Sequence, residues 1–369
     1  MVFFSVELEL FENPNHLEHY HPKFLLLSNP EMYYDCERRI VKSWTDGFID
    51  RDNKIVKEFR STFHSAFWEF YLHALFKNAK YSLDQSHNRP DFIITNSHVL
   101  YVEAVTSNIK KNGKSESLRG MNDILSMVTP PWAEPTFYKT LDEAIIRLSN
   151  SIKVKYEKVK REYKKCSWVD ETAPFALAIS SYDQINYGRE YIYPMMALLY
   201  GLYYNTTDNS FSKKTSIRKA GTNSDIPLGL FLDSSHEEIS GILFSCTHTL
   251  GKLEALANSK FGVRHQLVYD IRYVYTDTKM PYKLQFVDQN NPEYLEDGLF
   301  LFHNPHAKNK IPLEMFDEAG VYQITYENDK ILGSPGMFPL VARISFDKHL
   351  DPIFSPYIKQ QIMLFNRKE

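Results

Sequence analysis

Three acidic side chains occupy surroundings in which carboxylates are rare. Glu69 lies inside the apolar run FWEFYL, and Glu103 lies inside the apolar run VLYVEAV. Asp91 follows Pro90 directly, twelve residues before Glu103. A buried carboxylate without a partner is costly, so each of the three is expected to have a cation nearby. Carboxylates are the ligands that Mg²⁺ prefers, and Mg²⁺ activates water and neutralises phosphate in displacements at phosphorus.

The elements that would position these residues can be read from the hydrophobic pattern. Apolar residues recur every three to four positions in 55–78 and in 139–165, which predicts two helices. Strands are expected at 91–96, 98–106 and 174–180, with a further short strand around 81–83. The predicted order is helix, three strands, helix, strand. An irregular surface loop is expected over 107–137, a mobile connection or exposed loop over 205–225, and a strand-like run at 226–232. In the strand 98–106, alternation places Glu103 on one face with Val99, Tyr101 and Val105.

In this order and with these acidic residues, the chain resembles the PD-(D/E)xK nuclease superfamily, which has the restriction-endonuclease fold. The resemblance covers about residues 55–182 and rests on Glu69 in the helix, Pro90-Asp91 at a strand start, and Glu103 in the paired strand. It implies that Asp91 and Glu103 are metal ligands and that Glu69 is an accessory acid that holds metal or water. All three count as candidate catalytic residues.

The sequence departs from this superfamily at one catalytic position. The motif lysine, which orients water and stabilises developing charge, should stand two residues after Glu103, where this chain has Val105. Some superfamily members carry that lysine on a nearby helix. The second helix offers four candidates, which are Lys153, Lys155, Lys158 and Lys160. Lys155 is preferred as the catalytic lysine because it flanks the inward stripe, and Lys153 and Lys158 follow it closely.

Each acidic residue also has an ordinary structural explanation. Asp91 after proline is typical of a turn, Glu69 could pair with His73 or with an arginine, and Glu103 could be a carboxylate at a strand edge. The occurrence of all three in this order of elements favours the metal-site interpretation.

Two basic segments could follow a phosphate backbone beside such a site. Residues 153–165 hold seven Lys or Arg against two Glu. Residues 110–119 hold four basic residues against one Glu. The nucleic-acid-binding residues proposed from them are Lys110, Lys111, Lys114, Arg119, Lys153 and Lys158. The alternative is a solvated helix face with Glu157–Arg161 and Lys158–Glu162 as i,i+4 pairs.

Other motifs point more weakly to chemistry. The spacing His16-x-x-His19-x-His21 suits zinc, but it lacks cysteines and a fourth ligand, so a solvent-exposed cluster is favoured. The turn at 302–308 is explained by Asn304-Pro305. A Cys246–His248 catalytic pair remains open, although 242–246 reads as a buried strand and favours a core thiol.

Composition sets the broad class. Of 369 residues, 43% are hydrophobic and 24% are charged, with a net charge of −3, as in a globular protein rather than a non-specific nucleic-acid coat. The three cysteines are far apart and form no CxxC, which favours reduced thiols in the cytoplasm. The first ten residues do not resemble a signal peptide, and no apolar run reaches membrane-spanning length.

These observations predict a mixed α/β (α+β) protein with a restriction-endonuclease-like αβββαβ core. Residues 1–54 form an N-terminal segment, 55–185 the nuclease-like core, and 186–369 a mixed region that is either a second domain or an extension of the same sheet. The predicted function is a cytoplasmic endonuclease that uses Mg²⁺, with Mn²⁺ as a substitute. It would act on nucleic acid, with DNA favoured, and have no membrane partner; restriction or phage defence would fit the superfamily. The C-terminal region would select substrate or form a homodimer surface. The alternative is a catalytically inactive nucleic-acid-binding or assembly module on the same core.

Overall fold

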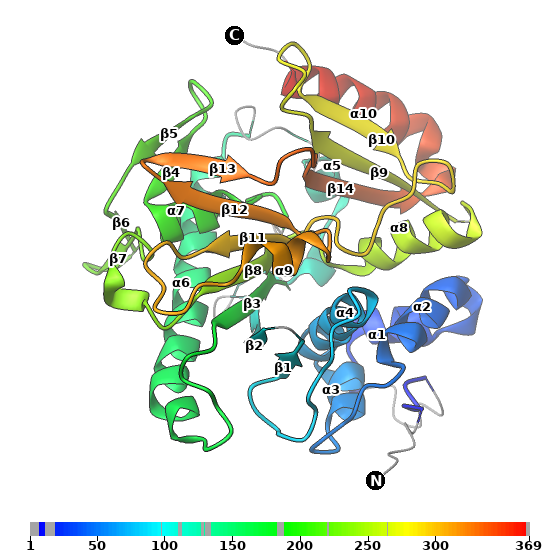
Figure 1. Ribbon diagram of the computed structural model, residues 1–369. Helices are drawn as coiled ribbons and strands as arrows, with labels where there is room; N and C mark the ends of the chain where they lie inside the picture. The colour runs from blue at the N-terminus through cyan, green and yellow to red at the C-terminus, as the bar shows by residue number, and fades with distance from the viewer. Residues whose placement is uncertain are drawn as a thin grey trace.

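The chain folds around a central sheet that is covered by helices on both faces (Figure 1). The structure is a computed structural model, and it describes residues 7–11, 19–96, 98–109, 113–126, 129, 134–182, 188–219, 221–263 and 265–366. The fold is therefore of the mixed α/β class that the sequence predicts.

The central sheet contains seven described strands in the order β1-β2-β3-β8-β11-β12-β13. Strands β2, β3 and β8 are mutually parallel, β1 pairs with β2 in antiparallel orientation, and β11 is antiparallel to β8 and parallel to β12. The strands are β1 (Phe92–Thr95), β2 (Val99–Ser107), β3 (Phe175–Ser181), β8 (Gly241–Ser245), β11 (Phe300–His303), β12 (Tyr322–Glu327) and β13 (Lys330–Gly333).

The predicted order of elements in the first half is present. Helix α4 (His64–Asn78) precedes β1 and β2, and the long helix α6 (Phe137–Arg161) connects β2 to the parallel strand β3. The short strand expected around 81–83 is reduced to one antiparallel bridge between Leu83 and Ile94.

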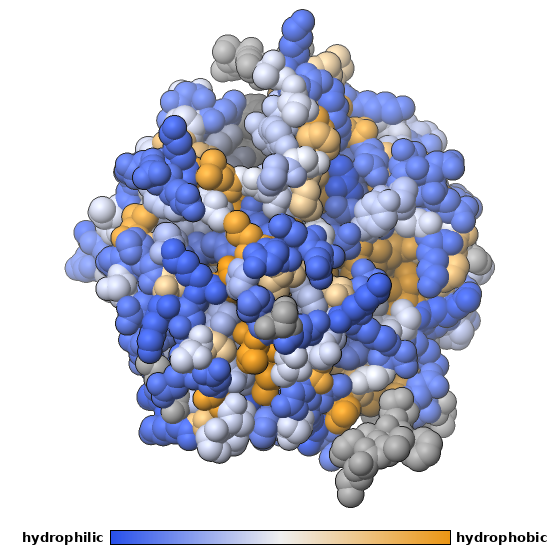
Figure 2. Space-filling model, viewed as in Figure 1, coloured by the Kyte–Doolittle hydropathy of each residue, from blue (hydrophilic) through white to orange (hydrophobic). Residues whose placement is uncertain are grey.

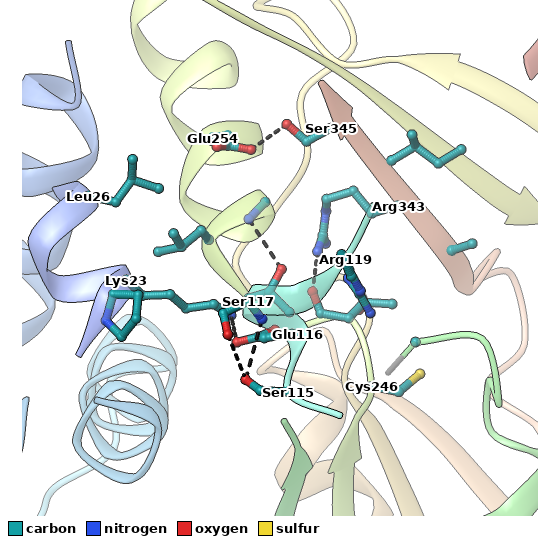
Figure 3. A pocket seen from close by; sticks show the side chains of 18 of the residues that line it. Lys23, Leu26, Ser115, Glu116, Ser117, Arg119, Cys246, Glu254, Arg343 and Ser345 are labelled. Atoms are coloured by element: carbon teal, nitrogen blue, oxygen red, sulfur yellow. Dashed lines mark hydrogen bonds and ion pairs between the residues drawn. The ribbon is translucent and has the colours of Figure 1, made fainter. Parts of the chain in front are cut away.

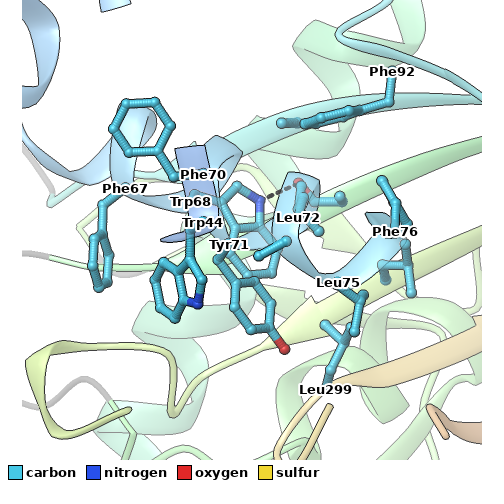
Figure 4. Packing of buried hydrophobic residues seen from close by; sticks show 14 of the residues in the cluster. Trp44, Phe67, Trp68, Phe70, Tyr71, Leu72, Leu75, Phe76, Phe92 and Leu299 are labelled. Carbon is cyan, nitrogen blue, oxygen red and sulfur yellow. Dashed lines mark hydrogen bonds between the residues drawn. The ribbon is translucent and has the colours of Figure 1, made fainter. Parts of the chain in front are cut away.

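The two faces of β2 divide as the alternation predicts. Tyr101, Val99 and Val105 pack with α6, whereas Leu100 and Val102 pack with α4. One helical layer contains α1 (Pro22–Ser28), α2 (Asp35–Thr45), α3 (Ile55–Ser61), α4 and α8 (Leu250–Phe261), and the other contains α6 and α7 (Tyr193–Tyr200). In the first layer the large side chains of α4 gather with Trp44, Phe92 and Leu299 (Figure 4).

The helix predicted over 55–78 is interrupted. Phe63 has a positive φ of 62° with ψ −63°, and its N–H donates to Glu58 O, so α3 ends and α4 starts anew at His64. A bulky residue rarely takes this conformation, but the Phe63 ring is fully buried between Phe59 and Phe67. The packing of these rings overrides the local helical periodicity.

The second half continues the central sheet across the predicted boundary at 185, because β8 pairs with β3. It adds a three-stranded sheet in the order β10 (Tyr282–Phe286), β9 (Gln266–Tyr273) and β14 (Leu340–Asp347), and this sheet is covered by α10 (Asp351–Phe365). The assignment of separate roles to 55–185 and 186–369 stays a prediction.

Several sequence predictions for the connecting segments were wrong in detail. Residues 205–225, expected to be loop, contain β5 (Ser210–Lys213) and β6 (Ser216–Arg218), which pair with β4 (Leu202–Asn205) and β7 (Asp225–Pro227). The strand expected over 226–232 ends at Pro227, whose ring carries no N–H to continue a ladder. Within 107–137, expected to be irregular, the described residues include α5 (Met121–Ser126) and the 3₁₀ turn Glu116–Leu118.

Hydrophilic residues dominate the face drawn in Figure 2, and hydrophobic residues gather there only in small patches. Among the helices of the described residues, none combines the length and the apolar character that crossing a bilayer requires.

Candidate functional site

Glu103 lies at the middle of β2 and is only 1% exposed. It faces α6, as the alternation predicts, and Leu177 of β3 stands beside it in the parallel register. A carboxylate at this depth must be neutralised or hydrogen-bonded to remain ionised. Its partners therefore define the site.

Two lysines of α6 contact the same oxygen of Glu103. Lys155 Nζ lies 2.7 Å and Lys158 Nζ 2.9 Å from Glu103 Oε1. The two lysines are spaced i, i+3, so one helix face presents both ammonium groups to the carboxylate. The inward stripe of Ile152, Tyr156 and Val159 is buried, which fixes the rotation of α6. The prediction that Lys155 flanks this stripe and reaches the acidic cluster agrees with this geometry.

The second oxygen of Glu103 accepts a hydrogen bond from Tyr163. Tyr163 follows α6 in the 3₁₀ turn Tyr163–Lys165, and its ring is 1% exposed and packs against Phe175. Burial and then the Glu103 carboxylate raise the pKa of Tyr163, so this phenol stays a hydrogen-bond donor. The sequence analysis did not single out Tyr163; its position at the end of a basic helix, as the only aromatic residue of 160–165, was the available signal.

Asp91 stands next to Glu103 across the strand pair. Phe92 pairs with Val102, and continuing this antiparallel register by one residue places Asp91 opposite Glu103. Asp91 Oδ2 accepts a hydrogen bond from the backbone N–H of Ala104 at 2.7 Å. The guanidinium of Arg51, a second residue that the sequence analysis missed, donates to Asp91 O at 2.9 Å and holds the start of β1.

Glu69 belongs to α4, in the helical layer on the other side of the sheet from α6, and it interacts electrostatically with Asp91 and Glu103. Its expected partner His73 instead contacts Trp44 O at 2.7 Å, so the predicted Glu69–His73 alternative is not formed. Burial, and next the Asp91 carboxylate, raise the pKa of Glu69 well above its usual value, and Arg51 opposes this shift. The partly buried Glu69 thus senses the charge of Asp91.

The electrostatics of the three carboxylates are unequal. Burial favours the neutral form of Glu103, but Lys155, Tyr163 and Lys158 outweigh it and lower its pKa. Asp91 has the opposite balance: burial and then the charge of Glu103 raise its pKa to about 7, although both lysines pull it down. Ionised Asp91 beside ionised Glu103 is the unfavourable arrangement that an added cation would relieve.

The carboxylates of Asp91 and Glu103 are the candidate ligands for a divalent cation. Within the described residues, no group of three or more His, Cys, Asp or Glu side chains is arranged to hold a metal. Mg²⁺ commonly uses one or two carboxylates and completes its shell with water. Asp91 and Glu103 supply two, and a carboxylate has about four acceptor sites, of which Glu103 uses three. About one acceptor site of Glu103 and the second oxygen of Asp91 are left for a cation, and the Mg²⁺ site stays a prediction.

The predicted nucleic-acid-binding residues are divided between two places. Lys158 belongs to the carboxylate cluster, and Lys153 is exposed on the same helix. Lys114 is exposed, whereas Arg119 lines a separate cavity. Lys110 and Lys111 lie outside the described residues.

The cavity that contains Arg119 has a volume of about 680 Å³ and lies where β8 leads into α8 (Figure 3). Lys23 reaches Glu116 at 2.6 Å across it, and His64 Nε2 lies 3.3 Å from the same carboxylate. Arg343 is held by Glu293, a buried acid that also pairs with Lys252. These cations already face the chain's own acids, and the sequence analysis did not identify these ion pairs.

Cys246 and His248 are core residues, as the favoured interpretation predicts. Each is 2% exposed, and the His248 ring centroid lies 3.9 Å from that of Tyr71. Burial raises the pKa of the Cys246 thiol and lowers the pKa of His248 well below its usual value. Of the proposed histidine cluster, His16 lies outside the described residues, and His21 caps α1 by accepting from the backbone N–H of Lys23.

Comparisons with protein-family models, curated proteins and solved structures found no match for this chain.

Proposed function

We propose that the protein is a Mg²⁺-dependent phosphodiesterase that cleaves nucleic acid, with Asp91, Glu103, Glu69 and a helix lysine at its active site. One observation carries the proposal. Lys155 places an ammonium 2.7 Å from Glu103 Oε1, beside Asp91, although the position two residues after Glu103 is Val105. This contact supports the proposal because the Lys155 ammonium would take the part of the missing motif lysine. The order helix, strands, helix, parallel strand gives further support.

Each residue has a role that follows from its surroundings. Asp91 and Glu103 would hold the metal, which when bound supplies charge neutralisation at the phosphate and a more acidic water. Lys155 and Lys158 keep Glu103 ionised and offer N–H donors to the non-bridging phosphate oxygens, where charge develops. Glu69, which senses the charge of Asp91, would orient the attacking water.

The metal would carry no more than part of the positive charge at this site. The two ammonium groups would act with it on one carboxylate and on the substrate, and the burial of Glu103, which is 1% exposed, strengthens its own interactions with them. DNA remains the favoured substrate. A cytoplasmic location and a role for 186–369 in substrate selection or dimerisation remain parts of the proposal.

A second function is favoured by a specific observation. Three of the acceptor sites of Glu103 are filled by Lys155, Lys158 and Tyr163, so the chain neutralises this carboxylate without a metal. A nucleic-acid-binding or assembly module with no catalysis would need only such a self-contained cluster and the exposed lysines of α6.

The deciding experiment measures cleavage of supercoiled plasmid, linear duplex, single-stranded DNA and RNA with Mg²⁺, with Mn²⁺ and with chelator. Wild type is compared with Asp91→Ala, Glu103→Ala and the control Glu157→Ala, which removes an exposed acid from α6. Metal-dependent cleavage that is lost in the first two variants and kept in the third supports the phosphodiesterase. Binding of nucleic acid without cleavage of any substrate would favour the second function.

A further inference from the structure

A second cavity, of about 400 Å³, lies between the central sheet and the three-stranded sheet. Its walls come from the segment before α7, the β4–β5 hairpin, strands β11 to β13 of the central sheet, and β9 and β10 of the three-stranded sheet. Among the described residues that line it, none belongs to the Asp91–Glu103–Lys155 cluster. A ligand bound here would contact both sheets at once.

Aromatic rings dominate the walls of this cavity. Tyr193 and Tyr204 stack with their ring centroids 3.9 Å apart and their planes inclined by 8°. The ring centroids of Tyr273 and Tyr282 are 5.2 Å apart. Phe211, on the hairpin, lies 5.5 Å from Tyr204. The rings at its walls include Tyr191, Tyr193, Tyr204, Phe211, Tyr273 and Tyr282. Such faces and edges bind planar rings by stacking, which is insensitive to the identity of the base.

Charge complementarity restricts the ligand further. The described lining residues include no Asp, Glu, Lys, Arg or His side chain. A phosphate or carboxylate placed inside would lose its water and gain no counter-charge, at high cost. The group that enters must therefore be neutral, and any charged part of the ligand must stay at the mouth.

One polar atom in these walls is buried and has no partner. Tyr191 is 6% exposed, and within the described residues its hydroxyl has no hydrogen-bond partner. Its backbone is left-handed, with φ 52°, a conformation that bulky residues seldom adopt. A buried hydroxyl without a partner is unfavourable. Neighbouring atoms close off this oxygen, so a ligand with a hydrogen-bonding edge would satisfy it once the adjacent rings move apart.

We propose that this cavity binds a neutral planar heterocycle of nucleobase size, stacked on the tyrosine rings and hydrogen-bonded to the Tyr191 hydroxyl. The volume is of the order typical for small-molecule sites. The heterocycle could belong to a free nucleoside or to a base unstacked from a strand, and both present the same ring. This proposal goes beyond phosphodiester cleavage and holds whether or not the protein cleaves.

The test measures binding to the full-length protein in EDTA, so that no strand is cut. Isothermal titration calorimetry uses adenosine, guanosine, cytidine and uridine, and 2-aminopurine fluorescence follows a short single-stranded oligonucleotide that carries this base analogue. Indole and choline are the comparison ligands, one aromatic without a base edge and one cationic. The variants are Phe211→Ala and Tyr191→Phe, with Tyr294→Ala as an exposed aromatic control outside this cavity.

We expect saturable binding of at least one probe that presents a base, weakened about tenfold by Phe211→Ala and about fivefold by Tyr191→Phe. Tyr294→Ala should bind as wild type does. Tyr191→Phe should melt no lower than wild type, because it removes only the hydroxyl without a partner. Binding of the oligonucleotide alone, lost in Phe211→Ala, would identify the source as a strand; binding of nucleosides as well would show that the ring suffices.

The proposal is overturned if no nucleoside or oligonucleotide binds saturably. It is equally overturned if binding survives both cavity variants, or if indole or choline binds as tightly as the best nucleoside with the same sensitivity to Phe211→Ala. The melting curves separate loss of the site from loss of the fold.

Discussion

Replacing the lysines of α6 one at a time should reveal how Glu103 is kept ionised inside the protein. Lys155→Met keeps the aliphatic stem and removes the ammonium that lies 2.7 Å from Glu103 Oε1. Lys158 and Tyr163 remain, so the carboxylate loses one charged hydrogen bond out of three. A hydrogen bond to a charged group contributes about 1.5–3 kcal/mol, and this range is the expected loss of unfolding free energy.

The second lysine should contribute less alone and more in combination. The Lys158 side chain is 34% exposed against 21% for Lys155, so solvent screens it more strongly. Removing both leaves a buried carboxylate with only the Tyr163 hydroxyl, and breaking a buried pair in this way costs about 3–5 kcal/mol. Lys153→Met, on the exposed side of α6, should change stability by about 0.5 kcal/mol at most.

Urea unfolding, followed by tryptophan fluorescence at pH 7.5, measures these differences, and single-turnover cleavage measures the catalytic share. Loss of a donor aimed at developing charge lowers rates by about 10²–10³-fold, so Lys155→Met should lose that much activity under conditions where it is still folded. The reasoning is refuted if Lys155→Met and the double variant unfold at the same urea concentration as Lys153→Met.

Three further predictions concern other parts of the molecule. Trp68→Phe should lower the unfolding free energy by about 1–3 kcal/mol, measured in urea, because the buried Trp68 Nε1 donates to Ala178 O at 2.9 Å and joins α4 to β3; an unchanged midpoint would contradict this. Burial opposes ionisation of Glu116, but His64 and Lys23 lower its pKa to about 2. Ionised Glu116 therefore stabilises the fold by up to about 3 kcal/mol above about pH 5, and this contribution is lost as the pH falls towards 2. In Glu116→Gln the free energy of unfolding should therefore fall less steeply with pH over that range. A slope equal to that of wild type would count against this prediction. In the native protein Cys166 should react with a thiol reagent first, followed only on unfolding by the two buried cysteines; equal labelling of all three would disprove their burial.

The local pattern of the sequence was enough to predict the elements of the first half and the faces on which their residues lie. Alternation placed Glu103 on the face of β2 that carries Tyr101, and the structure shows that this face meets α6. The apolar stripe of α6 placed Lys155 at its flank. Both follow from fixed periodicities of 2.0 and 3.6 residues. The register that brings Asp91 opposite Glu103 was not predicted, and it is seen only in the pairing of β1 with β2.

What the sequence did not predict depends on contacts between distant segments. The break at Phe63 arises from the packing of buried rings, which local periodicity does not encode. Strands β8 and β3, which pair, are about 65 residues apart in the sequence. The 400 Å³ cavity is lined by residues that lie between positions 191 and 366. Tyr163 reaches Glu103 because a 3₁₀ turn follows α6, which a charge run gives no reason to expect.

The most direct test of the central claim is the single-turnover cleavage rate of wild type and Asp91→Asn on the preferred nucleic acid, as a function of Mg²⁺ concentration. Asp91→Asn keeps the shape of the side chain and the acceptor for Ala104 N–H, and it removes the charge that faces Glu103. The proposal predicts a rate that saturates with Mg²⁺ in wild type and falls by about 10³-fold or more in a variant that melts no lower than wild type. Equal rates in the two proteins, or cleavage that persists in chelator, would contradict it.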